Sequence, residues 1–253
     1  MARRLMSLCF ALVLALLSSA GVAISVQAAP PRAVRFTEAE LFFELNDTDG
    51  DLGIHGSIDG GPWTYLAIEG PGDRTVLEIL SRSQMQSQGL TQLFFESAEP
   101  PFDELAPEEF FRRFPEGRYE IQGLLQNGGE IESSAVLSHV LAAPPQNVTV
   151  SGLPAATDCD AVLPVVSEPV TLRWDPVTTS HPEVGRPGAI KVIRYQLFVE
   201  REGIKLSLDL QPSVAEFEIP TSVTALGGEF KFEIIARTTA GNNTAIESCF
   251  VVQ

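Results

Sequence analysis

The chain has 253 residues, of which 44% are hydrophobic and 20% charged, and its 33 acidic and 17 basic side chains give a net charge of −16. Such an excess of carboxylates repels phosphate backbones and anionic lipid headgroups, so it excludes nucleic acid as a partner and favours cations. The chain is long enough for two domains of ordinary size, each with its own core.

The first 28 residues have the layout of a secretory signal peptide. Two arginines precede an apolar run over residues 5–24, and the small-residue site Val26-Gln27-Ala28 follows. A run of about 20 apolar residues can also span a bilayer, so an uncleaved anchor is the alternative. The small residues after the run favour cleavage. We therefore expect a secreted, periplasmic or cell-surface protein that does not stay in the membrane.

Residues 34–143 are predicted to form an immunoglobulin-like β-sandwich. Short β-branched or aromatic runs that end at Gly, Pro, Asn or Asp indicate strands. They lie near AELFFEL, GIHGSID, WTYLAIE, TVLEILS, TQLFFES, RYEIQGLL and SSAVLSHVL. One helical turn is expected at APEEFFRRF, because Pro107 suits the first helical position and the acids after it suit the positive end of a helix. Asn127-Gly128 predicts a tight hairpin turn.

The stretch ELNDTDGDLGIHG, residues 44–56, concentrates acidic side chains in a turn that contains glycine. It places Asp47, Asp49 and Asp51 at alternate positions. Calcium prefers six to eight hard oxygen ligands, many of them carboxylates, so this ladder predicts a calcium site. Asn46 or Asp59 would add further oxygens.

The same stretch resembles the first half of an EF-hand calcium loop. It departs from that pattern at the sixth position, which is Leu52 rather than Gly, and at the twelfth, which is Ile58 rather than Glu. The alternative interpretation is a plain hydrated turn, since Asp and Gly are turn formers. A transition metal is not expected, because only His55 and no cysteine lies nearby in the sequence.

The segment AAPPQNVTV is the predicted domain boundary, because Pro144 and Pro145 stiffen a short linker and cannot lie within a central strand. Residues 144–253 then form a second predicted β-sandwich. In FKFEIIA the apolar residues alternate with Lys231 and Glu233, which is typical of a half-buried strand. The expected core of this domain consists of Leu172, Trp174, Tyr195, Leu197, Phe230, Phe232 and Ile234.

This second half resembles a fibronectin type III module over about 105 residues. PPQNVTVSGL is similar to the family's proline-led first strand, PVTLRWDPV to its second strand with Trp174 as the core tryptophan, and IRYQLFVE to its third. FEIPTSVTALGGEFKFEIIARTTAGNNTAIE resembles the last half of the module. The family usually has a tyrosine where Phe230 stands, so the hydroxyl bond of a tyrosine corner is missing.

Removal of the signal peptide leaves two cysteines, Cys159 and Cys249. In an exported protein an even pair predicts one disulfide, and two buried free thiols are the alternative. A bridge closing a loop of about 90 residues is worth about 4 kcal/mol in the chain-entropy model.

The sequence contains no G-x-S-x-G, no H-E-x-x-H and no phosphate loop. We therefore predict an all-β, non-enzymatic protein of two tandem immunoglobulin-like β-sandwiches behind a signal peptide. It would work by adhesion, by binding an extracellular or cell-surface protein or polysaccharide, or as a structural spacer. The alternative is an extracellular hydrolase in which the type III-like module is an accessory domain.

Overall fold

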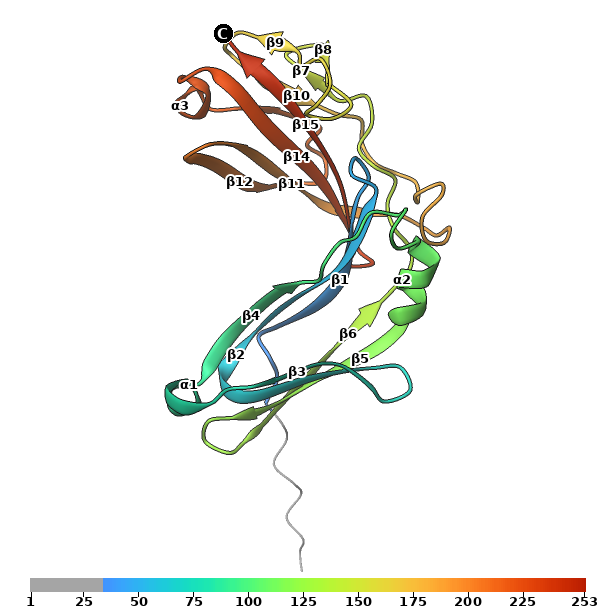
Figure 1. Ribbon diagram of the computed structural model, residues 1–253, viewed down its shortest axis with the longest axis vertical. Helices are drawn as coiled ribbons and strands as arrows, with labels where there is room; N and C mark the ends of the chain where they lie inside the picture. The colour runs from blue at the N-terminus through green and yellow to red at the C-terminus, as the bar shows by residue number, and fades with distance from the viewer. Residues whose placement is uncertain (1–33) are drawn as a thin grey trace, which may run out of the picture. The chain divides into compact units, whose positions relative to one another are not determined.

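The computed structural model describes residues 34–253, and the predicted signal peptide lies outside this range (Figure 1). Most of the described chain is β-strand, and its helices are short, so the predicted all-β fold class is confirmed. None of the helices in this range is long and apolar enough to cross a membrane.

The first half of the described chain contains two helices among its strands. In chain order the elements are β1 (Glu38–Asn46), β2 (Asp51–Gly70), β3 (Arg74–Leu80), α1 (Ser83–Gln88), β4 (Leu90–Glu96), α2 (Pro107–Arg113), β5 (Gly117–Leu125) and β6 (Glu130–Leu137). The second half has mostly short strands before the long ones at its end. They are β7 (Thr149–Val150), β8 (Leu153–Pro154), β9 (Val165–Val166), β10 (Thr171–Arg173), β11 (Val192–Arg201), β12 (Ile204–Leu210), β13 (Glu216–Glu218), α3 (Thr221–Thr224), β14 (Gly228–Thr238) and β15 (Asn243–Val252).

One long strand replaces two of the predicted ones. GIHGSID and WTYLAIE are both parts of β2, which bends where its register shifts between Asp59 and Trp63. Residues 51–59 pair with β1 and residues 55–63 with β4, whereas residues 65–70 pair with β3 and residues 63–69 with β5. The Gly-Gly-Pro sequence at the bend interrupts the ladder without ending the strand, as glycine and proline do at bulges.

Helix α2 forms where the sequence predicts a helical turn, with a proline at its start, acids in its first turn and arginines in its last. Its buried residues Phe110 and Phe111 pack edge-on against Phe43 of β1, at 6.0 and 5.4 Å between ring centroids. They join the core of the first half, which centres on the fully buried Trp63 and Tyr119.

The second half has its own core between two sheets. Strands β13, β10, β7 and β8 form one sheet, and β12, β11, β14 and β15 lie in the other. All seven core residues predicted for this half belong to the buried cluster between them. Trp174 meets Tyr195 edge-on at 5.4 Å, and the Tyr195 hydroxyl accepts a hydrogen bond from the Val177 amide at 2.8 Å.

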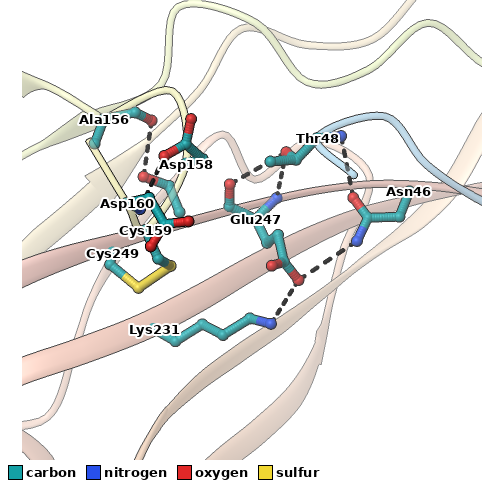
Figure 2. Close-up of a disulfide and its surroundings, with 10 residues drawn as sticks. Asn46, Thr48, Ala156, Asp158, Cys159, Asp160, Lys231, Glu247 and Cys249 are labelled. Atoms are coloured by element: carbon teal, nitrogen blue, oxygen red, sulfur yellow. Dashed lines mark hydrogen bonds and ion pairs between the residues drawn. A yellow bond between two sulfur atoms is a disulfide. The ribbon is translucent and has the colours of Figure 1, made fainter. Parts of the chain in front are cut away.

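The predicted disulfide is present, and Cys159 and Cys249 lie 4.9 Å apart at their Cα atoms (Figure 2). It attaches the long segment before β9 to strand β15. On the same strand the Ser248 hydroxyl donates to the Ala156 carbonyl at 2.8 Å. The bridge therefore holds a segment with little secondary structure of its own against the edge of the core.

The two cores share one sheet. Strand β1 pairs in parallel with β15, where Glu44, Leu45 and Asn46 lie opposite Asn243, Thr244 and Ala245. This pairing makes a path from β12 through β11, β14, β15, β1, β2 and β5 to β6, and Figure 1 shows β1 beside β15. The division into domains at residues 34–143 and 144–253 stays a prediction, because the shared sheet makes the described residues one compact unit.

Candidate functional site

The acidic turn between β1 and β2 lies against strand β15. Asp47 donates its amide to the Ala245 carbonyl at 2.9 Å. The Thr48 hydroxyl donates to the Glu247 carbonyl and accepts from the Glu247 amide, at 3.2 and 3.0 Å (Figure 2). The turn is thus a docking element between the halves, which neither the calcium nor the plain-turn interpretation includes.

Of the five residues predicted to bind calcium, the structure keeps Asn46, Asp49 and Asp51 near one another, engages Asp47 elsewhere and places Asp59 far away. The Asp47 carboxylate lies 2.8 Å from Nε2 of His181. Asn46 caps the turn, since its Oδ1 accepts from the amides of Thr48 and Asp49, and its Nδ2 donates to Asp49 at 3.1 Å. Asp59 pairs with Glu38 at the opposite end of the β1–β2 hairpin, eight residues from Asp51, or about 26 Å along a strand.

Two carboxylates of the turn have raised pKa values, although the charge of Lys231 partly offsets the shift at Asp49. Burial and then the charges of Glu99, Asp49 and Glu247 raise the pKa of Asp51 to about 6. Burial and then Glu247 also raise the pKa of Asp49. The Asp51 Oδ1 atom is buried and has no hydrogen-bond partner. This end of the sheet therefore has a strong negative potential.

The face of the shared sheet that carries these acids holds a groove of about 430 Å³. Alternation along paired strands puts its side chains on one face. The groove is lined by Glu38, Glu40, Phe42, Glu44, His55, Ser57, Phe94, Glu96, Arg194, Gln196, Phe198, Lys205, Glu233, Ile235, Arg237 and Asn243. It thus draws on β1, β2 and β4 from the first half and on β11, β12, β14 and β15 from the second.

One charged pair crosses the groove floor. The guanidinium of Arg237, whose side chain is 7% exposed, lies 2.6 Å from Glu40 and stands over the Phe42 ring at 4.5 Å. Burial, followed by the charges of Glu44 and Glu247, raises the pKa of Glu233 to about 7. Phe94 remains 62% exposed at the rim. The groove combines surplus carboxylates with exposed aromatic surface.

A histidine and two glutamates meet at one end of this groove. One ligand atom from each of His55, Glu96 and Glu99 lies within 4.8 Å of the others. Nε2 of His55 is 2.7 Å from Oε1 of Glu99, and the imidazole is 4% exposed. Burial lowers the pKa of His55, but the Glu99 hydrogen bond and nearby carboxylates outweigh it and raise the pKa overall.

Sequence reasoning missed this cluster because Glu99 lies 44 residues from His55 and reaches it only through the pairing of β2 with β4. The tyrosine corner that is missing from the second half is present in the first half. The Tyr119 hydroxyl donates to the Pro115 carbonyl at 2.9 Å, four residues upstream at the start of β5. The segment FPEGRY carries that signal, a tyrosine just after a proline-glycine turn.

A buried polar junction joins the halves beside the acidic turn. Asn242 is 1% exposed, accepts from the Phe43 amide at 3.0 Å, and donates to the carbonyls of Ser138 and Val140 at 2.6 and 3.0 Å. The buried Thr244 hydroxyl donates to the Ala142 carbonyl at 3.0 Å. Because these partners lie across the boundary between the predicted domains, the junction fixes how β15 meets β1.

No family model and no curated protein matches the chain. Among solved structures it is similar to a tetra-tandem repeat in the extending region of a large adhesion protein, at 12% identity and a TM-score of 0.28 over 85% of this chain and 49% of that one. It is also similar to a segment of two fibronectin type III domains from chicken tenascin, at 11% identity and a TM-score of 0.28 over 85% of this chain and 98% of that one. A third similar structure is a Ca²⁺-stabilised adhesin of an Antarctic bacterium, at 13% identity and a TM-score of 0.27 over 86% of this chain and 50% of that one. The chain spans about half the length of the first of these, and similarities at this level carry no argument about function.

Proposed function

We propose that the mature chain is a non-enzymatic recognition and adhesion module of the cell exterior. In this proposal its two cores are locked together so that one sheet face presents a continuous acidic groove. Its partner would be an extracellular or cell-surface protein or polysaccharide. The Cys159–Cys249 disulfide supports an oxidising location outside the cytoplasm.

The observation that carries the proposal is the junction on strand β15. Two β-sandwiches on a bare linker would move relative to each other, and a groove shared by both would not keep its shape. Here backbone pairing, the docked acidic turn and the buried side chain of Asn242 all connect the same two strands. A surface built across such a junction is preorganised, which lowers the entropic cost of binding.

The chemistry of the groove favours a basic partner. Among its ionisable lining residues, five glutamates face only two arginines and one lysine. Complementary charge steers association, and the electrostatic attraction weakens as the salt concentration rises. The exposed ring of Phe94 adds the kind of aromatic anchor that contributes strongly when it is buried at an interface.

The proposal is tested by surface capture. The mature chain, residues 29–253, is immobilised and presented with protein and polysaccharide fractions from the exterior of the source organism. Phe94→Ala and Glu38→Lys should each reduce capture at least tenfold, and moderate salt should weaken it. Val136→Ala, which removes an exposed side chain that does not line the groove, is the matched control and should retain capture. Equal capture by all four proteins would refute the groove as the recognition surface.

We also propose that calcium stabilises the acidic turn. Asp49 and Asp51 supply carboxylates with raised pKa values. The Oδ1 oxygen of Asp51 has no hydrogen-bond partner, and a bound cation would give it one. Asp47 is engaged by His181, and Asp59 is too distant, so a site here would rest on Asp49, Asp51 and neighbouring oxygens. The ion would relieve the repulsion between these carboxylates and order the turn against β15.

A further inference from the structure

The His55, Glu96 and Glu99 cluster is a set of metal-ligand types assembled from two strands and the segment that follows them. His55 lies directly opposite Glu96 in the pairing of β2 with β4, so their side chains share one face of the sheet. Glu99 follows β4 on a segment held along β2 by backbone bonds. The Ser97 amide donates to the Ile54 carbonyl at 3.0 Å, and the Phe102 amide donates to the Gly50 carbonyl at 2.8 Å.

The histidine is held in a fixed orientation. Its ring lies 5.4 Å from the Phe42 ring and 6.4 Å edge-on from the Phe94 ring, between centroids. Packing on both sides leaves Nε2 directed at Glu99. Ligands that are already oriented lose little entropy when they bind an ion.

The absence of a side chain at Gly53 leaves room for the Glu99 carboxylate. A Cβ atom at position 53 would overlap the Glu99 carboxylate, so a side chain there would exclude the carboxylate from its place above β2. Gly53 is not in the left-handed region of backbone space, and its turn geometry therefore does not explain its glycine. The space it leaves is filled by the carboxylate that faces His55.

We propose that His55, Glu96 and Glu99 bind one divalent transition-metal ion, for which Zn²⁺ is the best match. One imidazole and two carboxylates are ligands that zinc accepts, and three protein ligands leave a fourth position for water. Zinc bonds of about 2.0–2.2 Å place tetrahedral ligand atoms roughly 3.3–3.6 Å apart. The distance between Nε2 of His55 and Oε1 of Glu99, 2.7 Å, must increase slightly, and the exposed side chain of Glu96 must move closer to both.

Calcium fits this cluster less well. It needs six to eight oxygen ligands, and the most firmly held donor here is a nitrogen. A second feature indicates that a cation belongs at this end of the sheet: the buried Asp51 Oδ1 has no hydrogen-bond partner, and Glu99 is the charged group that affects Asp51 most. Asp51 lies outside the ligand set, so it would supply negative potential rather than a bond.

A bound ion would clamp the segment after β4 to β2. That segment is otherwise held by the backbone bonds noted above, by the Ser97 hydroxyl, which accepts from the Ile54 amide at 3.0 Å, and by packing of Phe102 against the first core. His55 and Glu96 also line the groove, so the open coordination position would lie at its edge. This inference does not depend on the adhesion role, because metal binding is measured on the isolated chain.

The test uses the mature chain after treatment with a chelator and desalting. Titration calorimetry with ZnCl₂ should show one equivalent bound, and Glu96→Gln should weaken binding at least tenfold. His55→Phe should abolish it, while keeping an aromatic ring between Phe42 and Phe94. Glu38→Gln removes one charge from the same groove but lies outside the cluster, so it should bind as the wild type does.

Two results would overturn the proposal. One is a folded wild-type chain that binds no zinc, and the other is equal affinity in the wild type and in Glu96→Gln. Glu96 is exposed, so its variant is expected to fold normally and decides the question even where His55→Phe is unstable. Calcium at the same concentration should not displace zinc, and displacement would assign the site to an oxygen-seeking ion instead.

Discussion

Replacing Asn242 with alanine should uncouple the two cores. The side chain is buried, accepts one hydrogen bond from β1 and donates two to the segment that follows β6. Alanine makes none of these bonds, and it leaves the Phe43 amide and two carbonyls without their partner. The perturbation therefore acts at the junction and leaves both hydrophobic clusters unchanged.

The magnitude follows from those three bonds. Each is worth about 1 kcal/mol net, and more where water does not reach the group left behind, so the total is about 3 kcal/mol. For a chain of this size 1 kcal/mol corresponds to about 2–4 °C in Tm, which predicts a loss of about 6–12 °C. The loss should appear as earlier separation of the halves as well as lower stability.

The chain offers one reporter for each core, because Trp63 is buried in the first and Trp174 in the second, and the sequence has two tryptophans. With fluorinated tryptophan incorporated, ¹⁹F NMR during urea unfolding follows each core without any substitution. The two signals should disappear at the same urea concentration in the wild type. In Asn242→Ala they should separate, since the more stable half no longer supports the other.

Two variants complete the test. Asn242→Asp keeps the acceptor for the Phe43 amide but replaces the donor with an oxygen facing two carbonyls, so it should be at least as destabilising as alanine. Gln211→Ala, at an exposed loop position, should change stability by less than about 0.5 kcal/mol. Independent transitions of the two tryptophans in the wild type would refute the argument that the junction makes one rigid module.

Three further predictions concern charge, metal and covalent links. The hydrogen bond from Arg186 is the main cause that lowers the pKa of Glu116 to about 2, so its stabilisation is complete above pH 4.5 and lost as pH falls toward 2. Because Glu116 is about one-third exposed, we expect only about 1 kcal/mol, and the difference between wild type and Glu116→Gln in urea unfolding should shrink as pH falls toward 2 and vanish below it. Millimolar calcium should raise the Tm, and Asp49→Ala should abolish the rise; calorimetric scans that show no calcium-dependent shift would remove that site. Replacing Cys159 and Cys249 together by serine should cost about 4 kcal/mol, chiefly in the Trp174 signal, and an unchanged midpoint would contradict the loop-closure account.

Local patterns in the sequence were sufficient for the all-β class and for several individual elements. Alternation in β14, the core role of Trp174, the short helix at Pro107 and the cysteine pair all follow from neighbouring residues or simple counting. The sequence could not distinguish a bend within β2 from a turn between two strands, because Gly-Gly-Pro is compatible with both. Local patterns therefore gave two strands where the chain forms one.

The sites depend on contacts that leave no local signature. Asn242 and Phe43 are 199 residues apart, and the parallel pairing of β1 with β15 has no turn to announce it. AGNNTA therefore looks like an ordinary turn and strand, although it holds the junction. The acidic turn was visible, but its docking on β15 depends on the Thr48 hydroxyl between the conspicuous aspartates.

The charge imbalance of the chain takes on a structural meaning at the junction. The first half contributes the carboxylates of Glu40, Asp47 and Glu116, and the second half meets each with a basic side chain or a histidine. Pairs that are partly exposed add little stability, but removing Glu40 would leave the buried guanidinium of Arg237 without its counter-ion. Such pairs penalise any other arrangement of the halves more than they strengthen this one. Three acidic side chains are thus paired across the junction, whereas the carboxylates that line the groove without a basic partner give it its charge.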